Sequence, residues 1–233
     1  MASFKKISII IPTYNESATI EELLRRLEAV DLGMEKEIII VDNNSTDGTQ
    51  EILQRCASHH ILIFQERNMG MSNSIRRGLQ VASGDLLMKQ DADLEYDPND
   101  IKLLLAPILE GKAEAAIGSR FLRGTSHAAW NFKHLVGNKL LTYASNIITN
   151  MFLTDMESCY KLYTRSVYES LDLRSQRFEF EPEITVEFAK RNVKVWEVAI
   201  SYSPRNYSEG KKVKWIDGFH AMWTMIKVAY LRK

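Results

Sequence analysis

The sequence has little cysteine, no net charge and no long apolar run. Its two cysteines, Cys56 and Cys159, stand far apart and match no metal-ligand spacing, which indicates a reducing compartment. The 30 basic and 30 acidic residues cancel, so nothing predicts a general attraction to nucleic acid or membrane. No apolar run approaches the roughly 20 residues of a membrane span, and no signal-peptide pattern is present. We therefore expect a cytoplasmic protein, with a peripheral position at the cytoplasmic membrane face as the alternative.

Two common phosphate-binding motifs are also missing. The sequence has no Gly-x-x-x-x-Gly-Lys-Ser/Thr, and no Gly-x-Gly-x-x-Gly follows the first apolar run. These absences argue against a P-loop protein and against a dinucleotide-binding fold. The five histidines show no metal-ligand spacing, and each is expected to be an ordinary surface or core residue.

Short apolar runs alternate with helical patterns along the first half of the chain. The runs cover residues 7–11, 37–41, 61–64 and 86–88, and the first helical pattern has apolar residues at positions 20, 23, 24 and 27. Continuous apolar strands are typical of a sheet covered on both faces. The sequence therefore predicts an α/β fold with a mostly parallel central sheet flanked by helices.

Polar clusters follow three of these runs, at residues 14–16, 42–47 and 91–95. The carboxyl ends of parallel strands meet at one edge of a sheet, where ligands bind. The acids Asp91, Asp93 and Glu95 would repel one another there unless a cation lay between them, and carboxylates suit Mg²⁺ or Mn²⁺. The alternative is a solvated acidic loop. Asp42 is placed to bind a ribose hydroxyl or a base edge, or to cap the turn before Gly48.

The second half contains a further helix over about residues 132–150, preceded by an aperiodic segment, 123–131, that we interpret as a loop over the site. Residues 215–233 carry an aromatic stripe at helical spacing with lysines around it. This pattern predicts an amphipathic helix. It lies either in a membrane interface or against the domain or a second subunit, as in a homo-oligomer.

Several segments together resemble the family 2 glycosyltransferases of the GT-A fold, in particular the dolichol- and polyprenyl-phosphate sugar synthases. The matching segments begin with Ile11-Pro12-Thr13-Tyr14-Asn15-Glu16 and include Asp91-Ala92-Asp93-Leu94 and Gly118-Ser119-Arg120-Phe121. They continue through Asp155-Met156-Glu157-Ser158-Cys159-Tyr160-Lys161 to Tyr202-Ser203-Pro204-Arg205 and Glu209-Gly210-Lys211-Lys212. The matches span residues 7 to about 218, in the family's order. The second loop departs from the frequent Asp-Asp-Gly-Ser, reading Asp42-Asn43-Asn44-Ser45.

The resemblance implies a catalytic domain over residues 1–214 and roles for individual positions. Asp91, Asp93 and Glu95 would bind the metal, the first two also the diphosphate, and Arg120 would meet the acceptor phosphate or the donor's charge. Residues expected to bind the nucleotide sugar are Pro12, Tyr14, Glu16 and Asp42 at the base and ribose, and Arg205, Lys211 and Lys212 at the phosphates.

The implied reaction is metal-dependent, inverting transfer of a hexose from a donor such as GDP-mannose or UDP-glucose to a polyprenyl or dolichyl phosphate. The alternative is transfer to a sugar or lipid hydroxyl in cell-surface polysaccharide synthesis. A hydroxyl acceptor requires a base, for which Asp155 or Glu157 are the candidates. Glu181 and Glu183 are weaker candidates, because acids are common in the first turn of a helix.

Two further classes of function compete with the transferase interpretation. A nucleotidyltransferase usually has a glycine-rich loop with Arg or Lys after the first strand, and residues 12–16 do not fit that pattern. A non-catalytic nucleotide-sugar-binding protein would have no need for Asp91, Asp93, Arg205 and Lys211 together. Within the transferase interpretation, the resemblance implies that Asp93, Arg120 and Asp155 are the catalytic residues.

Overall fold

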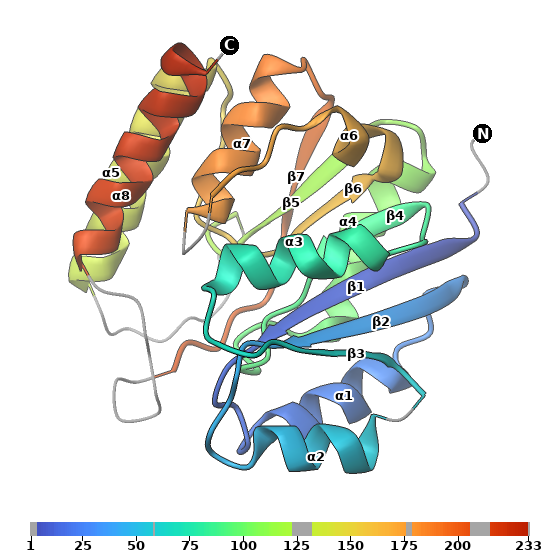
Figure 1. The fold of residues 1–233 in the computed structure, drawn as a ribbon. Helices are drawn as coiled ribbons and strands as arrows, with labels where there is room; N and C mark the ends of the chain where they lie inside the picture. Colours follow the sequence, from blue (N-terminus) through green and yellow to red (C-terminus); the bar gives the residue numbers. More distant parts are fainter. Residues whose placement is uncertain (1–3, 58, 123–131, 176–178, 206–214, 233) are drawn as a thin grey trace.

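A computed structural model describes residues 4–57, 59–122, 132–175, 179–205 and 215–232 (Figure 1). The strands are β1 (Lys6–Thr13), β2 (Glu35–Asp42), β3 (Ile61–Phe64), β4 (Leu86–Lys89), β5 (Ala115–Ser119), β6 (Lys161–Thr164) and β7 (Val195–Ala199). The α-helices are α1 (Ile20–Ala29), α2 (Thr49–Cys56), α3 (Met71–Val81), α4 (Ile101–Leu109), α5 (Phe132–Thr149), α6 (Arg165–Ser170), α7 (Phe180–Lys190) and α8 (Trp215–Ile226). A 3₁₀ turn, η1 (Pro98–Asp100), precedes α4, and a π-helical turn, η3 (Lys227–Leu231), continues α8.

The strands form one seven-stranded sheet in the order β3-β2-β1-β4-β6-β5-β7. Strand β1 pairs in parallel with β2 and β4, β2 with β3, and β5 with β7. Among the strands of the described ranges, only β6 is antiparallel to its neighbours, β4 and β5. The prediction of a mostly parallel sheet flanked by helices is confirmed. The antiparallel direction of β6 was not predicted, because an apolar run does not reveal which way a strand points.

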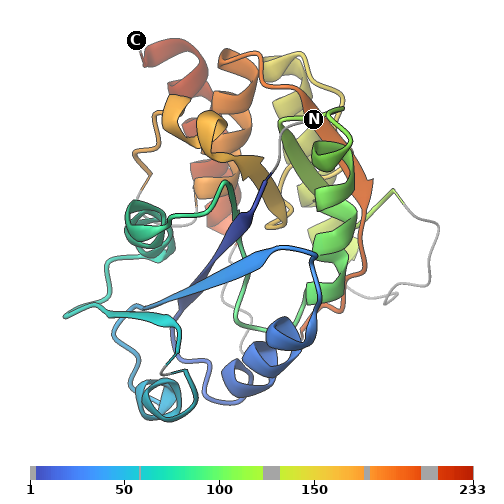
Figure 2. The same cartoon turned by 90° about the vertical axis from the view of Figure 1, so that its right-hand side faces the viewer.

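Helices cover both faces of the sheet, as the apolar strands predicted. Ile7, Ile9 and Ile11 of β1 belong to a buried cluster with residues of α1 and α4. Ile10, between them, points to the opposite face and packs in a cluster with α3 and α7. Figure 2 shows α3 and α4 on opposite sides of the sheet. This alternation follows from the two-residue period of a strand and buries both faces of the central strands.

Helices α5 and α8 form an outer layer next to α7 (Figure 1). Met225 and Val228 on the inner side of the C-terminal segment are fully buried, in a cluster with Ile117, Leu153 and Val186. The C-terminal helix predicted from the aromatic stripe is therefore present, and one of its faces packs on the domain. In the part of the chain described, we find no helix whose length and apolarity would carry it across a bilayer.

Candidate active site

Hydrogen bonds join the loops that follow β1 and β2. The Asn15 backbone N–H donates to the Ser45 hydroxyl at 2.9 Å, and the Asn15 side-chain oxygen accepts from the Thr46 N–H at 2.8 Å. The Glu16 N–H donates to the Thr49 hydroxyl at 3.0 Å. Asn15 has a φ of 52°, a left-handed conformation in which asparagine is enriched. These contacts hold two of the predicted polar clusters together at one edge of the sheet.

Asp42 ends β2 and is almost completely buried. Its Oδ2 accepts from the Ser45 N–H at 3.0 Å and from the Gln50 side-chain amide at 2.6 Å, which is the turn-capping role considered above. Its Oδ1 is buried and has no hydrogen-bond partner among the described residues. A buried polar atom in this state can accept a hydrogen bond from a ligand hydroxyl. Pro12 of β1 and Tyr14 are half-buried nearby, since β1 pairs with β2.

A cleft of about 530 Å³ is lined by loops that follow β1, β2, β4 and β7. In this lining, Arg205 Nη1 lies 3.0 Å from Glu16 Oε2, and Arg205 Nη2 lies 2.9 Å from Asp93 Oδ2. The Arg205 backbone N–H donates to Glu95 Oε1 at 2.8 Å, and the Tyr202 hydroxyl donates to Glu95 Oε2 at 2.7 Å. Three predicted acids from two separate loops therefore meet at Arg205: Glu16 and Asp93 contact its guanidinium, and Glu95 contacts its backbone N–H.

The carboxyl group of Asp93 lies among other acids. Burial, together with the negative charges of Asp91 and Glu95, raises the pKa of Asp93 to about 7. A divalent cation would relieve this repulsion, and carboxylate oxygens are the ligands that Mg²⁺ and Mn²⁺ prefer. The chemistry of these residues therefore fits a divalent metal, but in this structure the carboxylate oxygens of Asp91, Asp93 and Glu95 do not all lie within 4.8 Å of one another. In this structure the three acids have different cationic or N–H partners. Asp93 and Glu95 contact Arg205, whereas Asp91 Oδ1 lies 3.0 Å from Lys89 Nζ.

A chain of buried ion pairs lies behind Asp91. Lys89 Nζ is 3.0 Å from Glu181 Oε1, and Lys161 Nζ is 2.6 Å from Glu181 Oε2. Both lysine side chains are at most 3% exposed, and buried charges are tolerated only when they are paired. The sequence reasoning missed Lys89 and Lys161, although a lysine that ends an otherwise apolar strand could have drawn attention. Glu181, a weaker base candidate, instead neutralises two lysines.

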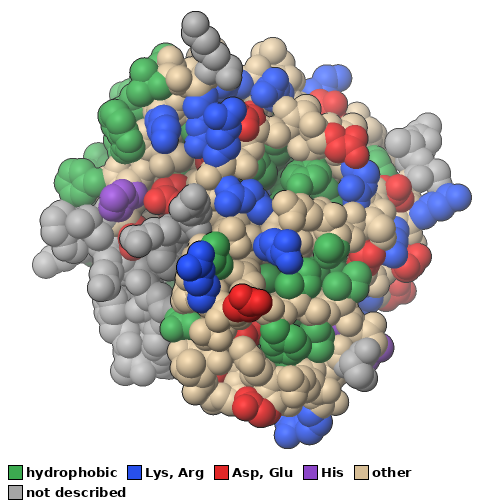
Figure 3. Space-filling model, in the orientation of Figure 1, with side chains coloured by type: hydrophobic (Ala, Val, Ile, Leu, Met, Phe, Trp, Pro, Cys, Tyr) green, Lys and Arg blue, Asp and Glu red, His purple; other side chains and the backbone are tan. Residues whose placement is uncertain are grey.

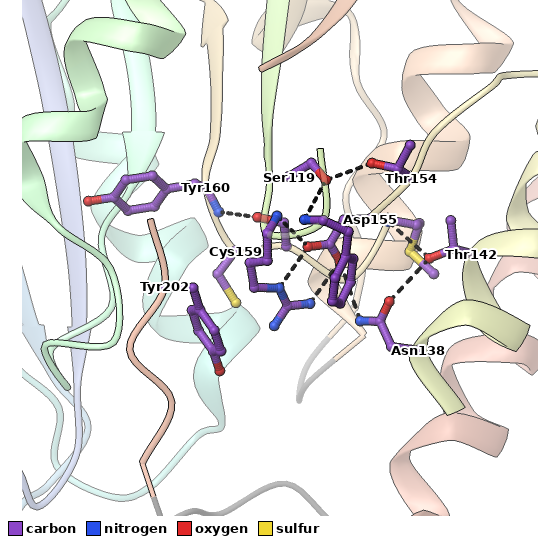
Figure 4. Close-up of polar contacts among 12 residues, drawn as sticks. Ser119, Asn138, Thr142, Thr154, Asp155, Cys159, Tyr160 and Tyr202 are labelled. Carbon is purple, nitrogen blue, oxygen red and sulfur yellow. Dashed lines mark hydrogen bonds and ion pairs between the residues drawn. The ribbon is translucent and has the colours of Figure 1, made fainter. Parts of the chain in front are cut away.

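Arg120 and Asp155 form a two-point ion pair. Figure 4 shows Asp155 with Ser119, Asn138 and Thr154 near it. Arg120 Nε lies 2.7 Å from Asp155 Oδ2, Arg120 Nη2 lies 2.8 Å from Oδ1, and the Arg120 backbone N–H also donates to Oδ2 at 3.0 Å. Burial by itself would raise the pKa of Asp155. The attraction of the Arg120 guanidinium and its hydrogen bonds have the larger, opposite effect, so the pKa of this carboxyl is lowered. Asn138 contacts Oδ1 at 3.4 Å, so both oxygens of the fully buried Asp155 already accept hydrogen bonds.

Neighbouring polar groups fix the position of this ion pair. The backbone N–H groups of Thr154 and Asp155 donate to the Glu197 carboxylate at 2.9 and 3.1 Å, and the Thr154 and Ser119 hydroxyls lie 2.6 Å apart. The guanidinium of Arg120 lies 4.9 Å from the centre of the Tyr202 ring, within the range of a cation–π contact. Residues of β5, of the segment before β6, and of β7 and the loop after it therefore fix the position of the ion pair.

The two other acids considered as bases have different surroundings. Glu183 is fully buried and accepts from the Ser175 N–H at 2.9 Å, so it holds the segment before α7. Glu157 is half-buried, its Oε1 has no hydrogen-bond partner among the described residues, and burial raises its pKa to about 7. The remaining predicted features fall outside the described residues: Lys211, Lys212 and the loop 123–131.

The chain matches a family model and named relatives. The model described as glycosyl transferase family 2 matches residues 8–172. A dolichol-phosphate mannosyltransferase of Pyrococcus furiosus is 32% identical over 88% of this chain. An undecaprenyl-phosphate 4-deoxy-4-formamido-L-arabinose transferase of Proteus mirabilis is 29% identical over the whole chain. The chain spans 59% and 72% of the lengths of these two relatives.

A solved structure supports the fold. Glucosyl-3-phosphoglycerate synthase from Mycobacterium tuberculosis, in complex with Mn²⁺, UDP and phosphoglyceric acid, superposes with a TM-score of 0.72 at 19% identity. The match covers 98% of this chain and 80% of that one, and the expected GT-A fold is confirmed. Because the family model matches more than half of the sequence, the chain belongs to glycosyl transferase family 2.

Proposed function

We propose that the protein transfers a hexose, with inversion, from a nucleotide-diphosphate sugar such as GDP-mannose or UDP-glucose to a polyprenyl or dolichyl phosphate. The names of both relatives specify a polyprenyl phosphate, as dolichol-phosphate or undecaprenyl-phosphate. The observation that carries the proposal is the meeting of Glu16, Asp93, Glu95 and Arg205 at one cleft. Such a cluster of acids around a cation suits a diphosphate that arrives with a divalent metal.

The donor binds along the edge formed by β1, β2 and β4. Asp42 Oδ1, buried without a partner among the described residues, accepts from the nucleoside, with Pro12, Tyr14 and Glu16 beside it. Mg²⁺ or Mn²⁺ held by Asp91, Asp93 and Glu95 would neutralise the charge that develops on the leaving diphosphate. The solved structure described above contains Mn²⁺ and UDP.

Cationic side chains of the chain itself lie beside the proposed metal and diphosphate site. Lys89 Nζ, 3.0 Å from Asp91 Oδ1, pairs with the Asp91 carboxylate and fixes its direction. Arg205 is the counter-ion of Glu16 and Asp93 before the donor arrives, and it then stabilises the negative charge of the diphosphate. Lys211 and Lys212, predicted from the same C-terminal segment, would add positive charge there.

The acceptor phosphate binds at Arg120. Asp155 engages the Nε and Nη2 edge of the guanidinium, so Asp155 positions Arg120, and the Nη1 edge carries further donors for a phosphate. A phosphate monoester is already ionised at neutral pH, so the attack on the sugar requires no strong base. The occupied oxygens of Asp155 agree with this role, since a base needs an oxygen that can receive a proton.

Transfer to a sugar or lipid hydroxyl is the second candidate function, and Glu157 is the observation that favours it. Its Oε1 has no hydrogen-bond partner among the described residues. Burial raises the pKa of Glu157 to about 7, near the value that suits a general base at neutral pH. Under this alternative Glu157, rather than Asp155, removes the proton of the acceptor hydroxyl.

The two functions can be separated by measuring nucleotide release from several nucleotide sugars in Mn²⁺. Each donor is tested alone, with a short polyprenyl phosphate, and with a matching polyprenol that has no phosphate. We expect release to depend on the lipid phosphate and to be unaffected by Glu157→Gln. Release that depends instead on a hydroxyl acceptor, and is lost in Glu157→Gln, would establish the second function.

Asp93→Asn tests the metal site in the same assay. We expect turnover to fall at least about 100-fold, because the variant removes a ligand and a charge at the diphosphate. Asp97→Asn is the matched control, since Asp97 is exposed and only caps η1. Near-normal turnover in Asp93→Asn would refute the metal assignment whatever the acceptor proves to be.

We also propose that the outer face of α5 and α8 meets the membrane that contains the acceptor. Leu140, Tyr143 and Ile147 of α5 are 65–68% exposed, and Phe219 and Trp223 of α8 are 68% and 59% exposed. Apolar side chains gather on the side of the molecule where these helices lie (Figure 3). Exposed aromatic and aliphatic residues on one helix face are typical of a segment in a membrane interface.

The charge of the same helices favours an anionic lipid surface over a second subunit. Helix α5 contains Lys133 and Lys139 and no acidic residue, and residues 215–233 contain three basic residues and one acid. Because the whole chain has no net charge, this layer is positive relative to the remainder. Basic residues near an anionic surface contribute about 1 kcal/mol each to binding.

Sedimentation with anionic and with neutral vesicles tests this surface. We expect Leu140→Ser and Trp223→Ser to reduce binding to anionic vesicles. Trp196→Ser is the matched control, because Trp196 is 49% exposed on the edge strand β7 and belongs to neither α5 nor α8. Unchanged sedimentation in the first two variants, or loss of a dimer in place of vesicle binding, would assign the surface to another role.

A further inference from the structure

A second group of metal-binding side chains lies outside the cleft, where α1 ends. His59 Nε2 is 2.9 Å from Glu28 Oε1, and His60 Nε2 is 2.8 Å from the same oxygen. Within the described ranges, this is the single group of three such residues whose ligand atoms all lie within 4.8 Å of one another. Sequence spacing did not predict this group, because the histidines are adjacent and Glu28 lies 31 residues before His59.

We propose that Glu28, His59 and His60 form a binding site for a borderline divalent cation, with Zn²⁺ as the ion that best suits the ligands. Two imidazoles and one carboxylate are a frequent zinc ligand set, and both histidines present the same ring nitrogen, Nε2. Mg²⁺ prefers oxygen ligands and is not expected here. The site is separate in ligand chemistry from the all-carboxylate group at the cleft.

The two separations between Glu28 and the histidines need little change to accept the ion, and the ligand atoms of His59 and His60 lie within 4.8 Å of each other. With bonds of about 2.0–2.1 Å at tetrahedral angles, the ligand atoms of zinc lie roughly 3.3 Å apart. The present separations of 2.8 and 2.9 Å therefore need to open by about half an ångström. His59 and Glu28 are 62% and 41% exposed and can move, whereas the His60 side chain, at 8% exposed, is held in place. The exposed side leaves room for water as a fourth ligand.

The surrounding groups fix the backbone of this site. Lys36 Nζ donates to the carbonyl oxygens of Leu27, Glu28 and Val30 at 2.7–3.0 Å, which anchors the C-terminal end of α1. Those three carbonyls partly offset the charge of Lys36, which would otherwise repel the ion.

The ion would tie the C-terminal end of α1 to the connection between α2 and β3. The N-terminal end of α1 adjoins the cleft, because Thr19 lines it. Eight residues separate Ile20 from Glu28, which is about 12 Å along the helix. Both α1 and α2 follow loops that contain donor-site residues, so a cation at their far ends would hold the two helices in a fixed relation. This role is structural and involves no step of the transfer reaction.

Titration with Zn²⁺ and with Co²⁺ tests the proposal, in an Asp93→Asn background that weakens the metal site at the cleft. We expect one Zn²⁺ per chain, a Co²⁺ visible spectrum of tetrahedral nitrogen and oxygen ligation, and a higher melting temperature with Zn²⁺. Glu28→Gln and His59→Ala remove exposed ligands without emptying the core, and each should weaken Zn²⁺ binding at least about tenfold. His220→Ala, at an exposed histidine of α8, is the control and should bind as the parent does.

Two results would overturn the proposal. Equal Zn²⁺ affinity in the parent, Glu28→Gln and His59→Ala would show that the metal binds elsewhere. A Zn²⁺-dependent dimer in sedimentation velocity, lost in His59→Ala, would show that the histidines bridge two copies and do not hold α1 to α2 within one chain.

Discussion

Replacing Arg205 by Gln should strengthen the binding of Mn²⁺ to the protein without nucleotide, while it weakens catalysis. Arg205 is the counter-ion of Glu16 and Asp93, at 3.0 and 2.9 Å, in the place where we put the metal and the diphosphate. A cation that enters the free site must therefore overcome the positive charge of the guanidinium. Without that charge the acids repel one another more strongly and attract Mn²⁺ more strongly.

The size of this effect follows from the exposure of the pair. At these separations and an effective dielectric constant of about 20, each ion pair has a gross attraction of about 5 kcal/mol. Desolvation offsets most of it, and the Arg205 and Asp93 side chains are each still 18% exposed. A net effect of about 1–3 kcal/mol remains, which corresponds to roughly 10- to 100-fold in Mn²⁺ affinity.

Isothermal titration of the protein with Mn²⁺, with and without a nucleotide diphosphate, measures both consequences. Arg205→Lys is the control, because it keeps the charge and loses the planar, two-armed contact. We expect Mn²⁺ binding close to wild type in Arg205→Lys and tighter binding in Arg205→Gln, with kcat reduced in both. Equal or weaker Mn²⁺ binding by Arg205→Gln, in a folded protein, would refute the placement of the metal beside Arg205.

Three further outcomes are expected. Burial opposes the charged form of Glu37, but hydrogen bonds from Ser8 and Ser83 lower its pKa to about 2. Its stabilisation is therefore full above the unfolded pKa and declines as the pH falls, by about 2 kcal/mol between pH 7 and pH 3, and Glu37→Gln should lose this part of the pH dependence in urea unfolding. Asp155→Asn should cost about 3–5 kcal/mol, because it leaves the buried Arg120 without its counter-charge; an unchanged melting temperature would contradict this. Gly84→Ala should destabilise the fold by several kcal/mol, because its Cβ would lie 2.6 Å from the Ser8 backbone nitrogen; a melting temperature within 1–2 °C of wild type would contradict the close packing.

The sequence predicted that acids in loops after different strands would lie close together. Asp93, Glu95 and Glu16 stand in the loops that follow β4 and β1, and the structure brings all three to Arg205, as expected for carboxyl ends of parallel strands. For Asp42, the sequence left two roles open: binding of the nucleoside and capping of the turn. Asp42 both caps its turn and has a second oxygen without a described partner, and only coordinates could show that one side chain does both.

Residues that act through distant partners were not predictable. Lys89 and Lys161 meet at Glu181 because β6 runs antiparallel beside β4 and α7 packs over them, and neither fact is encoded in an apolar run. Asp155 was predicted as a catalytic residue and a candidate base, and its complete burial against Arg120 emerged only from the packing of the segment before β6.

The sequence by itself determined the layered architecture, since the period of its apolar residues decides which faces of strands and helices avoid water. It also determined which loops carry the acids. The tertiary structure alone decided how those charges are paired, because an ion pair depends on distances of a few ångströms between groups up to 189 residues apart. The Glu28–His59–His60 group depends in the same way on where α1 ends relative to β3.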